Sequence, residues 1–172
     1  FIGGSGLYKI PNFKNSKWIE VSSNFGKTSS KICIGSLNGK NIAFLPRHGL
    51  DHNISPSKIN YRANIEALKK INVQNIVSIS AVGSLREDYK PSDFVLVDQF
   101  IDKTFLREKS FFDEDCVAHI PMSSPICENL KKISSKALEN LKLNFHSAGT
   151  YICIEGPQFS TLAESNLYRS GG

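Results

Sequence analysis

Apolar residues recur at helical spacing in two long stretches of the chain. In the first stretch, one face carries Ile59, Ala63, Ala67, Leu68 and Ile71. In the second, the matching positions are Ile126, Leu130, Ile133, Ala137 and Leu141. This spacing is typical of amphipathic helices. Ser55-Pro56 and Ser124-Pro125 are typical helix starts, with serine as the cap and proline in the first turn. We therefore expect two helices that begin there, and a third that begins near Ser160.

Shorter apolar runs predict the strands of a sheet. They cover residues 31–34, 41–45, 75–82, 94–97 and 150–154, and Phe1-Ile2 is interpreted as the end of a further strand. Asn38-Gly39 separates the first two runs and is typical of a two-residue hairpin turn. Strands that alternate with helices indicate an α/β fold, and the hairpin makes the sheet mixed rather than purely parallel. Because no repeat or linker interrupts the chain, we expect a single domain over residues 1–172.

Charge and hydropathy argue against a nucleic-acid surface and against a membrane span. The net charge is +5, but the lysines are spread along the 172 residues. The adjacent pairs Lys69-Lys70 and Lys131-Lys132 fall on the predicted helices, where a solvent-exposed face explains them. A nucleic-acid surface needs a denser basic stripe with interleaved aromatic residues. No apolar run approaches the roughly 20 residues of a membrane-spanning helix.

The four cysteines, Cys33, Cys116, Cys127 and Cys153, are scattered along the chain. No CxxC pair or Cys/His spacing suits a metal ion. No basic stretch followed by an apolar run opens the chain, so no secretory signal is visible. We interpret the cysteines as reduced thiols of a cytoplasmic protein, without a metal.

Three segments at the carboxyl ends of predicted strands could hold an anion. The first is Gly3-Gly4-Ser5-Gly6, where backbone N–H groups can approach an anion closely and the Ser5 hydroxyl adds a donor. A dinucleotide-binding loop is disfavoured there, because Lys9 stands where its third glycine belongs. In the second segment, Arg47 could grip two phosphate oxygens with its planar guanidinium, and His48 could donate a further hydrogen bond.

The third segment is Ser80-Ala81, where the serine hydroxyl and the alanine N–H would suit a phosphate oxygen. Each segment by itself is explained as well by a plain turn or an exposed loop. In open α/β sheets, however, ligands gather at the carboxyl ends of strands, so the three segments carry more weight together. They indicate a free phosphate held by neutral donors and one arginine.

Late in the chain, Gly156-Pro157 fixes a sharp turn beside Phe159. The Phe159 ring offers a flat surface on which a base could stack. A phenylalanine of the core is the alternative, and this segment taken alone favours that alternative.

Five stretches of the chain resemble the methylthioadenosine phosphorylase branch of the trimeric purine nucleoside phosphorylases. They run in the family's order over nearly the whole chain: IGGSGL, LPRHGLDHNISPSKINYRANIEALK, SAVGSLREDYKPSDFVLVDQFIDKT, HIPMSSPIC and GTYICIEGPQFSTLAES. Each stretch alone is weak evidence, but together they are highly specific. The resemblance implies a nucleoside phosphorylase-like α/β fold, with a mixed twisted sheet flanked by helices, and a homotrimer.

The resemblance also implies a reaction. Inorganic phosphate attacks the anomeric carbon of a nucleoside and releases a purine and a ribose 1-phosphate. Phosphate is then a co-substrate, and no cofactor is expected. Carried over by motif, the phosphate-binding residues are Ser5, Arg47, His48, Ser80 and Ala81. Phe159 would face the purine and ribose, Ser160 would lie at the base pocket, and His119 would reach into the pocket of a neighbouring subunit.

Two positions of the resemblance bear on the substrate. Related inosine and guanosine phosphorylases carry an acidic residue where this chain has Ser160, which favours methylthioadenosine. Leu162 stands where many relatives have arginine, a departure that leaves the reaction class intact. Inosine or methylthioinosine is an alternative substrate, and a fragment that binds nucleoside or phosphate without turnover is a second alternative.

The residue that activates the purine is not identified in this chain. In the family an acidic or amide residue serves the base, and by the resemblance it lies beyond Gly172. The closing Ser170-Gly171-Gly172 follows a helical pattern of barely three turns, with no further strand. We therefore expect a domain cut short at both ends, with its C-terminal part missing.

Overall fold

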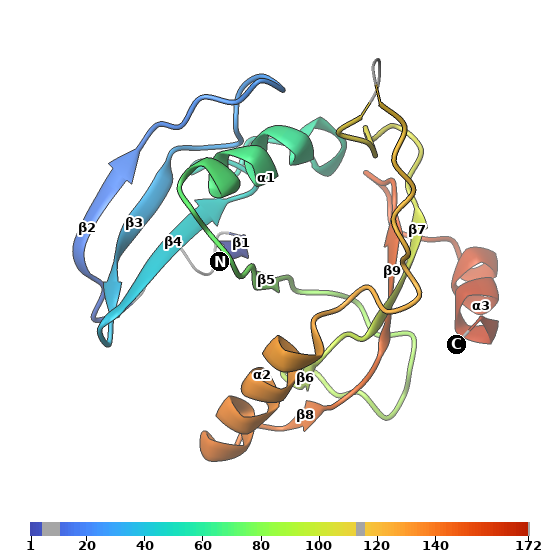
Figure 1. The fold of residues 1–172 in the computed structure, drawn as a ribbon. Helices are drawn as coiled ribbons and strands as arrows, with labels where there is room; N and C mark the ends of the chain where they lie inside the picture. The colour runs from blue at the N-terminus through green and yellow to red at the C-terminus, as the bar shows by residue number, and fades with distance from the viewer. Residues whose placement is uncertain (5–10, 113–115, 172) are drawn as a thin grey trace. The chain divides into compact units, whose positions relative to one another are not determined.

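The computed structural model describes residues 1–4, 11–112 and 116–171 (Figure 1). These residues form two compact units. The first unit comprises Phe1–Ala81 with Arg107–Phe111, and the second comprises Val82–Leu106 with Phe112–Gly172. Each unit has its own strands and helices, and the single domain that the sequence predicts stays a prediction.

The first unit contains a five-stranded mixed sheet. Its strands are β1 (Ile2–Gly3), β2 (Lys14–Ile19), β3 (Ile32–Leu37), β4 (Lys40–Pro46) and β5 (Ser78–Ile79). The order across the sheet is β2-β3-β4-β1-β5. The first three strands pair antiparallel, whereas β1 lies parallel to both β4 and β5. The predicted mixed sheet is therefore confirmed.

The hairpin between β3 and β4 forms where the sequence predicts it. Leu37 pairs with Lys40, so the turn consists of Asn38 and Gly39. Their φ angles are 47° and 75°. Positive φ at both central positions is the geometry of a type I′ turn, which Asn-Gly adopts readily and whose twist matches that of the strands.

The first α-helix begins later than Ser55-Pro56. Pro56–Lys58 forms a short 3₁₀ turn, η2, and the Ser55 side chain makes no capping hydrogen bond. Helix α1 spans Tyr61–Lys70 and is capped by Asn60, whose side chain accepts from the Ala63 N–H. The chain leaves helical geometry at Ile59 (ψ 125°), and a new helix begins after Asn60. Asn60 can start this helix because asparagine is as good a cap as serine.

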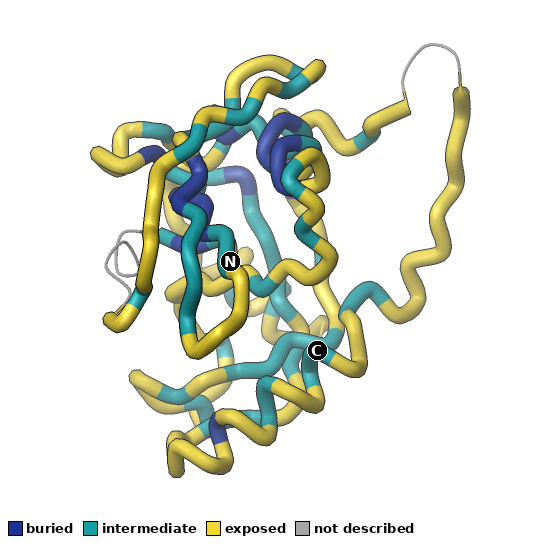
Figure 2. Tube along the Cα trace, turned by 60° about the vertical axis from the view of Figure 1, so that its left-hand side comes forward, coloured by how far each residue is buried: buried dark blue, intermediate teal, exposed yellow. Residues whose placement is uncertain are grey.

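Helix α1 packs on the sheet with the face that the sequence predicts. Ala67 and Leu68 form a buried cluster with Ile32 and Leu45 of the strands. Partly buried apolar side chains surround this cluster, among them Ile2, Ile19, Ile34 and Ile71. Figure 2 shows the buried segments of this unit on α1 and on the strands. This core holds β1, β3 and β4 together under α1.

The second unit is built from two short parallel pairings and two helices. Its elements are β6 (Phe94–Val95), β7 (Gln99–Lys103), α2 (Glu128–Asn140), β8 (Phe145–His146), β9 (Thr150–Ile154) and α3 (Leu162–Ser170). Strand β6 pairs with β8, and β7 pairs with β9. Between the two pairings, the Asp98 N–H donates to Gly149 and the Asp98 carboxylate accepts from the Gly149 N–H.

Two predicted elements differ from those observed. The run 75–82 contributes only Ser78–Ile79 to the sheet, because β1, its partner, is itself two residues long. Helix α2 begins at Glu128 behind Cys127 rather than at Ser124. The predicted apolar positions of α2 are largely exposed, with Ile133 at 57% and Leu141 at 67%, whereas Leu138 is the buried residue of this helix.

Candidate functional site

Three parallel strands of the first unit end at the same edge of the sheet. Gly3, the last residue of β1, pairs with Pro46 of β4 on one side and with Ile79 of β5 on the other. Gly4, Arg47 and Ser80 follow in the next row of the register. The carboxyl ends of parallel strands are where open α/β sheets bind their ligands. Described residues from each of the three predicted anion-binding segments therefore lie together at this edge.

Arg47 connects the three strand ends. Its backbone N–H donates to the Gly3 carbonyl (3.1 Å), which sets the residue beside β1. Its Nη1 donates to the carbonyl of Ile79 at the end of β5 (2.9 Å). A Cβ added to Gly4 would lie 3.8 Å from Nη2, so Gly4 lies close to the guanidinium. Half-buried Arg47 thus brings a fixed positive charge to the sheet edge.

His48 contacts Arg47 directly. Arg47 Nε donates to His48 Nε2 (3.1 Å), and His48 Nδ1 lies 2.8 Å from the Ile54 carbonyl oxygen. The ring of His52 packs against the His48 ring, with 4.7 Å between centroids and 36° between planes. Both ring nitrogens of His48 are occupied by protein groups, so in this arrangement no ring N–H of His48 is free to donate to a phosphate.

The loop after β4 supplies the groups that hold His48. Gly49 has φ 79°, and a Cβ there would lie 2.9 Å from Asn53 Oδ1, so a larger residue would strain the turn. The Ile54 N–H donates to the His48 carbonyl (3.1 Å) and closes the loop. Sequence reasoning missed Ile54 and His52 as parts of this site. The glycine directly after His48 was the one available signal of a tight turn.

The remaining predicted phosphate ligands are placed differently. Ser80 and Ala81 are exposed residues immediately after β5, next to the carbonyl that Arg47 contacts. Ser5 lies outside the described residues. Its predicted role is therefore not tested, although the preceding Gly4 lies beside Arg47.

Phe159 and Ser160 belong to the second unit. Phe159 is 94% exposed, so the alternative that it is a core residue is wrong for this unit. It follows Gly156, whose φ of 73° turns the chain after β9. The Ser160 hydroxyl lies 2.7 Å from that of Ser165, at the start of α3. Thr161 caps this helix in a capping box with Glu164, which fixes the segment after Phe159.

Glu155 anchors the loop that follows β7. The residue is 6% exposed, and its carboxylate accepts from the N–H groups of Phe105 (2.8 Å) and Leu106 (3.0 Å). It therefore joins the carboxyl ends of β7 and β9. No catalytic role is predicted for Glu155 from the sequence, and the structure shows a buried carboxylate that accepts hydrogen bonds from the backbone of the loop.

His119 lies in an extended, exposed segment of the second unit. Every described residue from 116 to 120 is exposed, with Val117 at 82% and Ile120 at 68%. Beyond them, Gln99 Nε2 donates to the Ser123 carbonyl and ties the end of the segment to β7. Within this chain, His119 is therefore exposed to solvent.

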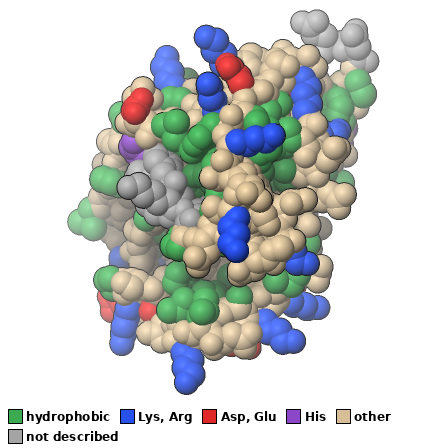
Figure 3. Space-filling view, turned by 90° about the vertical axis from the view of Figure 1, so that its left-hand side faces the viewer, with side chains coloured by type: hydrophobic (Ala, Val, Ile, Leu, Met, Phe, Trp, Pro, Cys, Tyr) green, Lys and Arg blue, Asp and Glu red, His purple; other side chains and the backbone are tan. Residues whose placement is uncertain are grey.

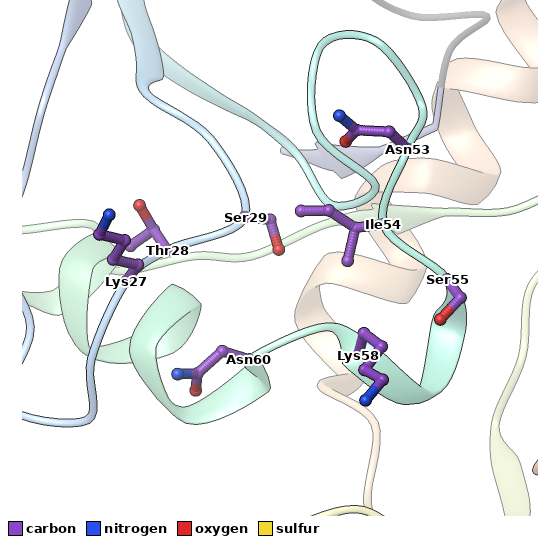
Figure 4. A pocket seen from close by; sticks show the side chains of 8 residues that line it. All are labelled: Lys27, Thr28, Ser29, Asn53, Ile54, Ser55, Lys58 and Asn60. Carbon is purple, nitrogen blue, oxygen red and sulfur yellow. The ribbon is translucent and has the colours of Figure 1, made fainter.

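A separate depression lies in the first unit, next to the loop that holds His48 (Figure 4). It has a volume of about 450 Å³ and is lined by Lys27, Thr28, Ser29, Asn53, Ile54, Ser55, Lys58 and Asn60. Several of its polar groups are already paired within the unit. Thr28 bonds to the Ser30 carbonyl, and the Asn60 amide bonds to the Phe25 carbonyl.

Other kinds of site find little support among the described residues. No group of three His, Cys, Asp or Glu side chains is placed to hold a metal ion in that part of the chain. No helix there has the length and apolar character needed to cross a membrane. Figure 3 shows Lys and Arg side chains scattered over the visible face rather than gathered in a stripe.

Comparison with known proteins adds the family. The chain matches the phosphorylase superfamily over residues 1–172. It is 55% identical over 168 residues to the S-methyl-5'-thioadenosine phosphorylase of Saccharolobus solfataricus, an alignment that covers 98% of this chain and 62% of the relative. It is 53% identical over 171 residues to the enzyme of the same name from Rhodospirillum rubrum, covering 99% of this chain and 58% of the relative.

Solved structures agree with these relatives. A methylthioadenosine phosphorylase from an antarctic soil metagenomic library superposes with a TM-score of 0.95 at 47% identity, over 99% of this chain and 60% of the other. The Schistosoma mansoni methylthioadenosine phosphorylase in complex with adenine superposes with a TM-score of 0.94 at 36% identity. This superposition covers 99% of this chain and 69% of the other. The chain spans about three fifths of the length of the two curated relatives. On its sequence and its α/β fold alike, this chain belongs to the phosphorylase superfamily.

Proposed function

We propose that the full-length protein cleaves S-methyl-5'-thioadenosine with inorganic phosphate, yielding adenine and methylthioribose 1-phosphate. The observation that carries the proposal is Arg47, whose guanidinium lies where β1, β4 and β5 end together. The names of relatives that are 53% and 55% identical to this chain over the aligned residues support methylthioadenosine as the substrate. An adenine complex of a structural relative supports a purine-binding site.

In the proposed reaction a phosphate oxygen forms a bond to the anomeric carbon while the bond from that carbon to the purine nitrogen breaks. Arg47 and the N–H and hydroxyl groups near it would hold phosphate below the ribose ring. Holding the nucleophile in place makes the attack effectively intramolecular, which lowers the barrier by up to roughly 7–11 kcal/mol in well-oriented cases. The phosphate anion also stabilises the positive charge that develops on the ribosyl ring.

The base would be recognised by residues of the second unit. The nearly fully exposed Phe159 ring offers an apolar surface on which a purine can stack. Ser160 provides a neutral hydroxyl where the inosine- and guanosine-cleaving relatives carry an acid, which favours a 6-aminopurine. The departing purine also needs a proton or a strong hydrogen bond, and no described residue is assigned to supply it.

We also propose that the protein works as a homotrimer in the cytoplasm. Large apolar side chains of the second unit are strongly exposed, including Phe105 at 76% and Val117 at 82%. Such exposure is typical of surfaces that a partner covers. The extended segment around His119 would then reach the nucleoside pocket of a neighbouring copy. None of the four cysteines is in a disulfide within the described residues, which is usual for proteins of a reducing compartment.

Substrate choice is tested by measuring purine release from methylthioadenosine, adenosine, inosine and methylthioinosine at saturating phosphate. We expect the highest kcat/KM for methylthioadenosine. A preference for inosine or methylthioinosine would support the same reaction class but with 6-oxopurine nucleosides as the substrates. Binding of nucleoside without any release from the full-length protein would instead support the non-catalytic alternative.

A further inference from the structure

We propose that the imidazole of His48 is a positioning group: it orients the Arg47 guanidinium toward phosphate rather than donating a hydrogen bond to the anion. The proposal rests on the proposed function in one respect, since it takes phosphate as the ligand of Arg47. It differs from the role that the family resemblance gives His48, which is a direct contact with the anion.

The two contacts of the imidazole allow a single protonation pattern. The Ile54 carbonyl can only accept a hydrogen bond, so His48 Nδ1 must carry the proton across the 2.8 Å separation. Arg47 Nε can only donate, so His48 Nε2 must present its lone pair across 3.1 Å. The neutral Nδ1–H tautomer satisfies both partners. The other neutral tautomer satisfies neither, and an imidazolium would turn an N–H toward the Arg47 N–H.

The loop itself holds the ring in this orientation. Ile54 is bonded to His48 twice, through its N–H to the His48 carbonyl (3.1 Å) and through its carbonyl to the ring. The ring of His52 packs on one face of the imidazole at 4.7 Å. Backbone and side chain of His48 are thus fixed against the same residue, and the lone pair of Nε2 is held toward Arg47.

These contacts fix the Arg47 guanidinium and leave N–H groups on Nη1 and Nη2 for a ligand. Of its five N–H groups, the one on Nε donates to His48 and one on Nη1 donates to the Ile79 carbonyl. A phosphate can therefore not use the edge formed by Nε. It must use the N–H groups that remain on Nη1 and Nη2, and Nη2 is the nitrogen beside Gly4. His48 would set which end of the arginine faces the anion.

Two substitutions of His48 distinguish the roles of its two ring nitrogens. In His48→Gln the amide oxygen lies four bonds from Cα, as Nε2 does, and it can accept from Arg47 Nε. In His48→Asn the amide nitrogen lies three bonds from Cα, as Nδ1 does, and it can donate to the Ile54 carbonyl but leaves Arg47 Nε without an acceptor. We expect the phosphate KM to rise about tenfold in His48→Asn and to stay within about threefold of wild type in His48→Gln. The nucleoside KM should change little in both.

A double-mutant cycle with Arg47→Ala tests whether His48 acts through the arginine. If it does, His48→Asn has little further effect on phosphate KM once Arg47 is removed. An independent, additive effect of His48→Asn in that background would overturn the proposal. Thermal unfolding of each variant shows whether the fold is retained, and the His48→Gln variant carries the comparison if His48→Asn does not fold.

The nitrogen-15 chemical shifts of the imidazole provide the direct readout. The full-length protein, with and without inorganic phosphate, should show the Nδ1–H tautomer at His48 in both states. An Nε2–H tautomer or an imidazolium with phosphate bound would show a direct contact and contradict the proposal. This measurement does not depend on turnover: purine release without phosphate would overturn the proposed function, whereas the tautomer alone decides how His48 meets Arg47.

Discussion

Arg47 gains its importance from its position rather than from its residue type. Arginine in a loop is common, but this one follows β4, donates to the last carbonyl of β5 and has its backbone bonded to β1. A planar guanidinium can bind two oxygens of a phosphate at once, which lysine cannot do. The sequence indicated the residue type and its place after a strand. It could not indicate the contacts with Ile79 and His48, which depend on how three separate segments meet.

Removing the guanidinium of Arg47 should weaken the binding of phosphate more than the binding of nucleoside. We expect Arg47→Ala to raise the phosphate KM by at least about an order of magnitude, because it removes charge-assisted hydrogen bonds. Steady-state kinetics with phosphate varied at saturating nucleoside measures this. Arg86→Ala is a matched control, since Arg86 forms an exposed ion pair with Asp88 in the second unit. Unchanged phosphate kinetics in Arg47→Ala would contradict the assignment.

Glu155 should prove important for stability. In Glu155→Gln the oxygen that accepts from both backbone N–H groups becomes a neutral amide oxygen, and the other carboxylate oxygen is replaced by an NH₂ group. We expect a loss of about 1–3 kcal/mol in the free energy of unfolding, measured by chemical denaturation. Glu87→Gln changes the same side chain at an exposed position and should have little effect. Equal stability of the two variants would show that the buried contacts of Glu155 contribute nothing measurable.

The elements that the sequence predicts well are those with a strong pattern of their own. The Asn38-Gly39 hairpin and the apolar face of α1 are both observed, because turn chemistry and burial act locally there. Strand β2 was missed because its residues are almost all exposed, so it shows no alternation. Strand β8 was missed because a two-residue strand is too short to leave a pattern. The register of β1 with β4 and β5, which creates the site, is a tertiary feature that no single segment encodes.

Asp93 links two elements of the second unit and should make its stability depend on pH. The His146 ring N–H, at 3.0 Å, and the Lys90 N–H both donate to this carboxylate, and they hold the pKa of Asp93 below its ordinary value. A lowered folded-state pKa contributes stability above the ordinary pKa, about 4, and that contribution is lost as the pH falls through the lowered value.

We therefore expect Asp93→Asn to unfold at a lower temperature than wild type at pH 5–6 and above, with the difference shrinking as the pH falls below about 4. Thermal unfolding followed by circular dichroism across this range measures it. Glu87→Gln is the control and should follow wild type. A difference between Asp93→Asn and wild type that is the same at every pH would rule out the ionised carboxylate as its source.

At the scale of the whole molecule, the family was recognisable from the order of five motifs, and the fold confirms it. The division into two units was not visible in the sequence, because no linker separates them and residues 107–111 belong to the first unit while their neighbours belong to the second. Phosphate candidates lie in the first unit, whereas Phe159, Ser160 and His119 lie in the second. Sequence patterns alone could not show how the candidate residues are distributed between the two units.

The exposed apolar side chains of the second unit should be buried in an oligomer. We expect light scattering of the full-length protein to give the mass of three chains. Substituting Val117, which is 82% exposed, by aspartate should shift the protein toward smaller species and lower its activity, because a charge would then be buried at the contact. A monomeric wild type with full activity would contradict both the trimer and the role given to His119.

Phosphate dependence tests the central claim most directly. Adenine release from methylthioadenosine should be measured with and without inorganic phosphate, and the sugar product identified by mass spectrometry. The convergence of Gly4, Arg47 and Ser80 at one sheet edge predicts no release without phosphate and methylthioribose 1-phosphate as the product. Release without phosphate, with free methylthioribose as the product, would mean that water is the nucleophile and that this edge of the sheet is not a phosphate site.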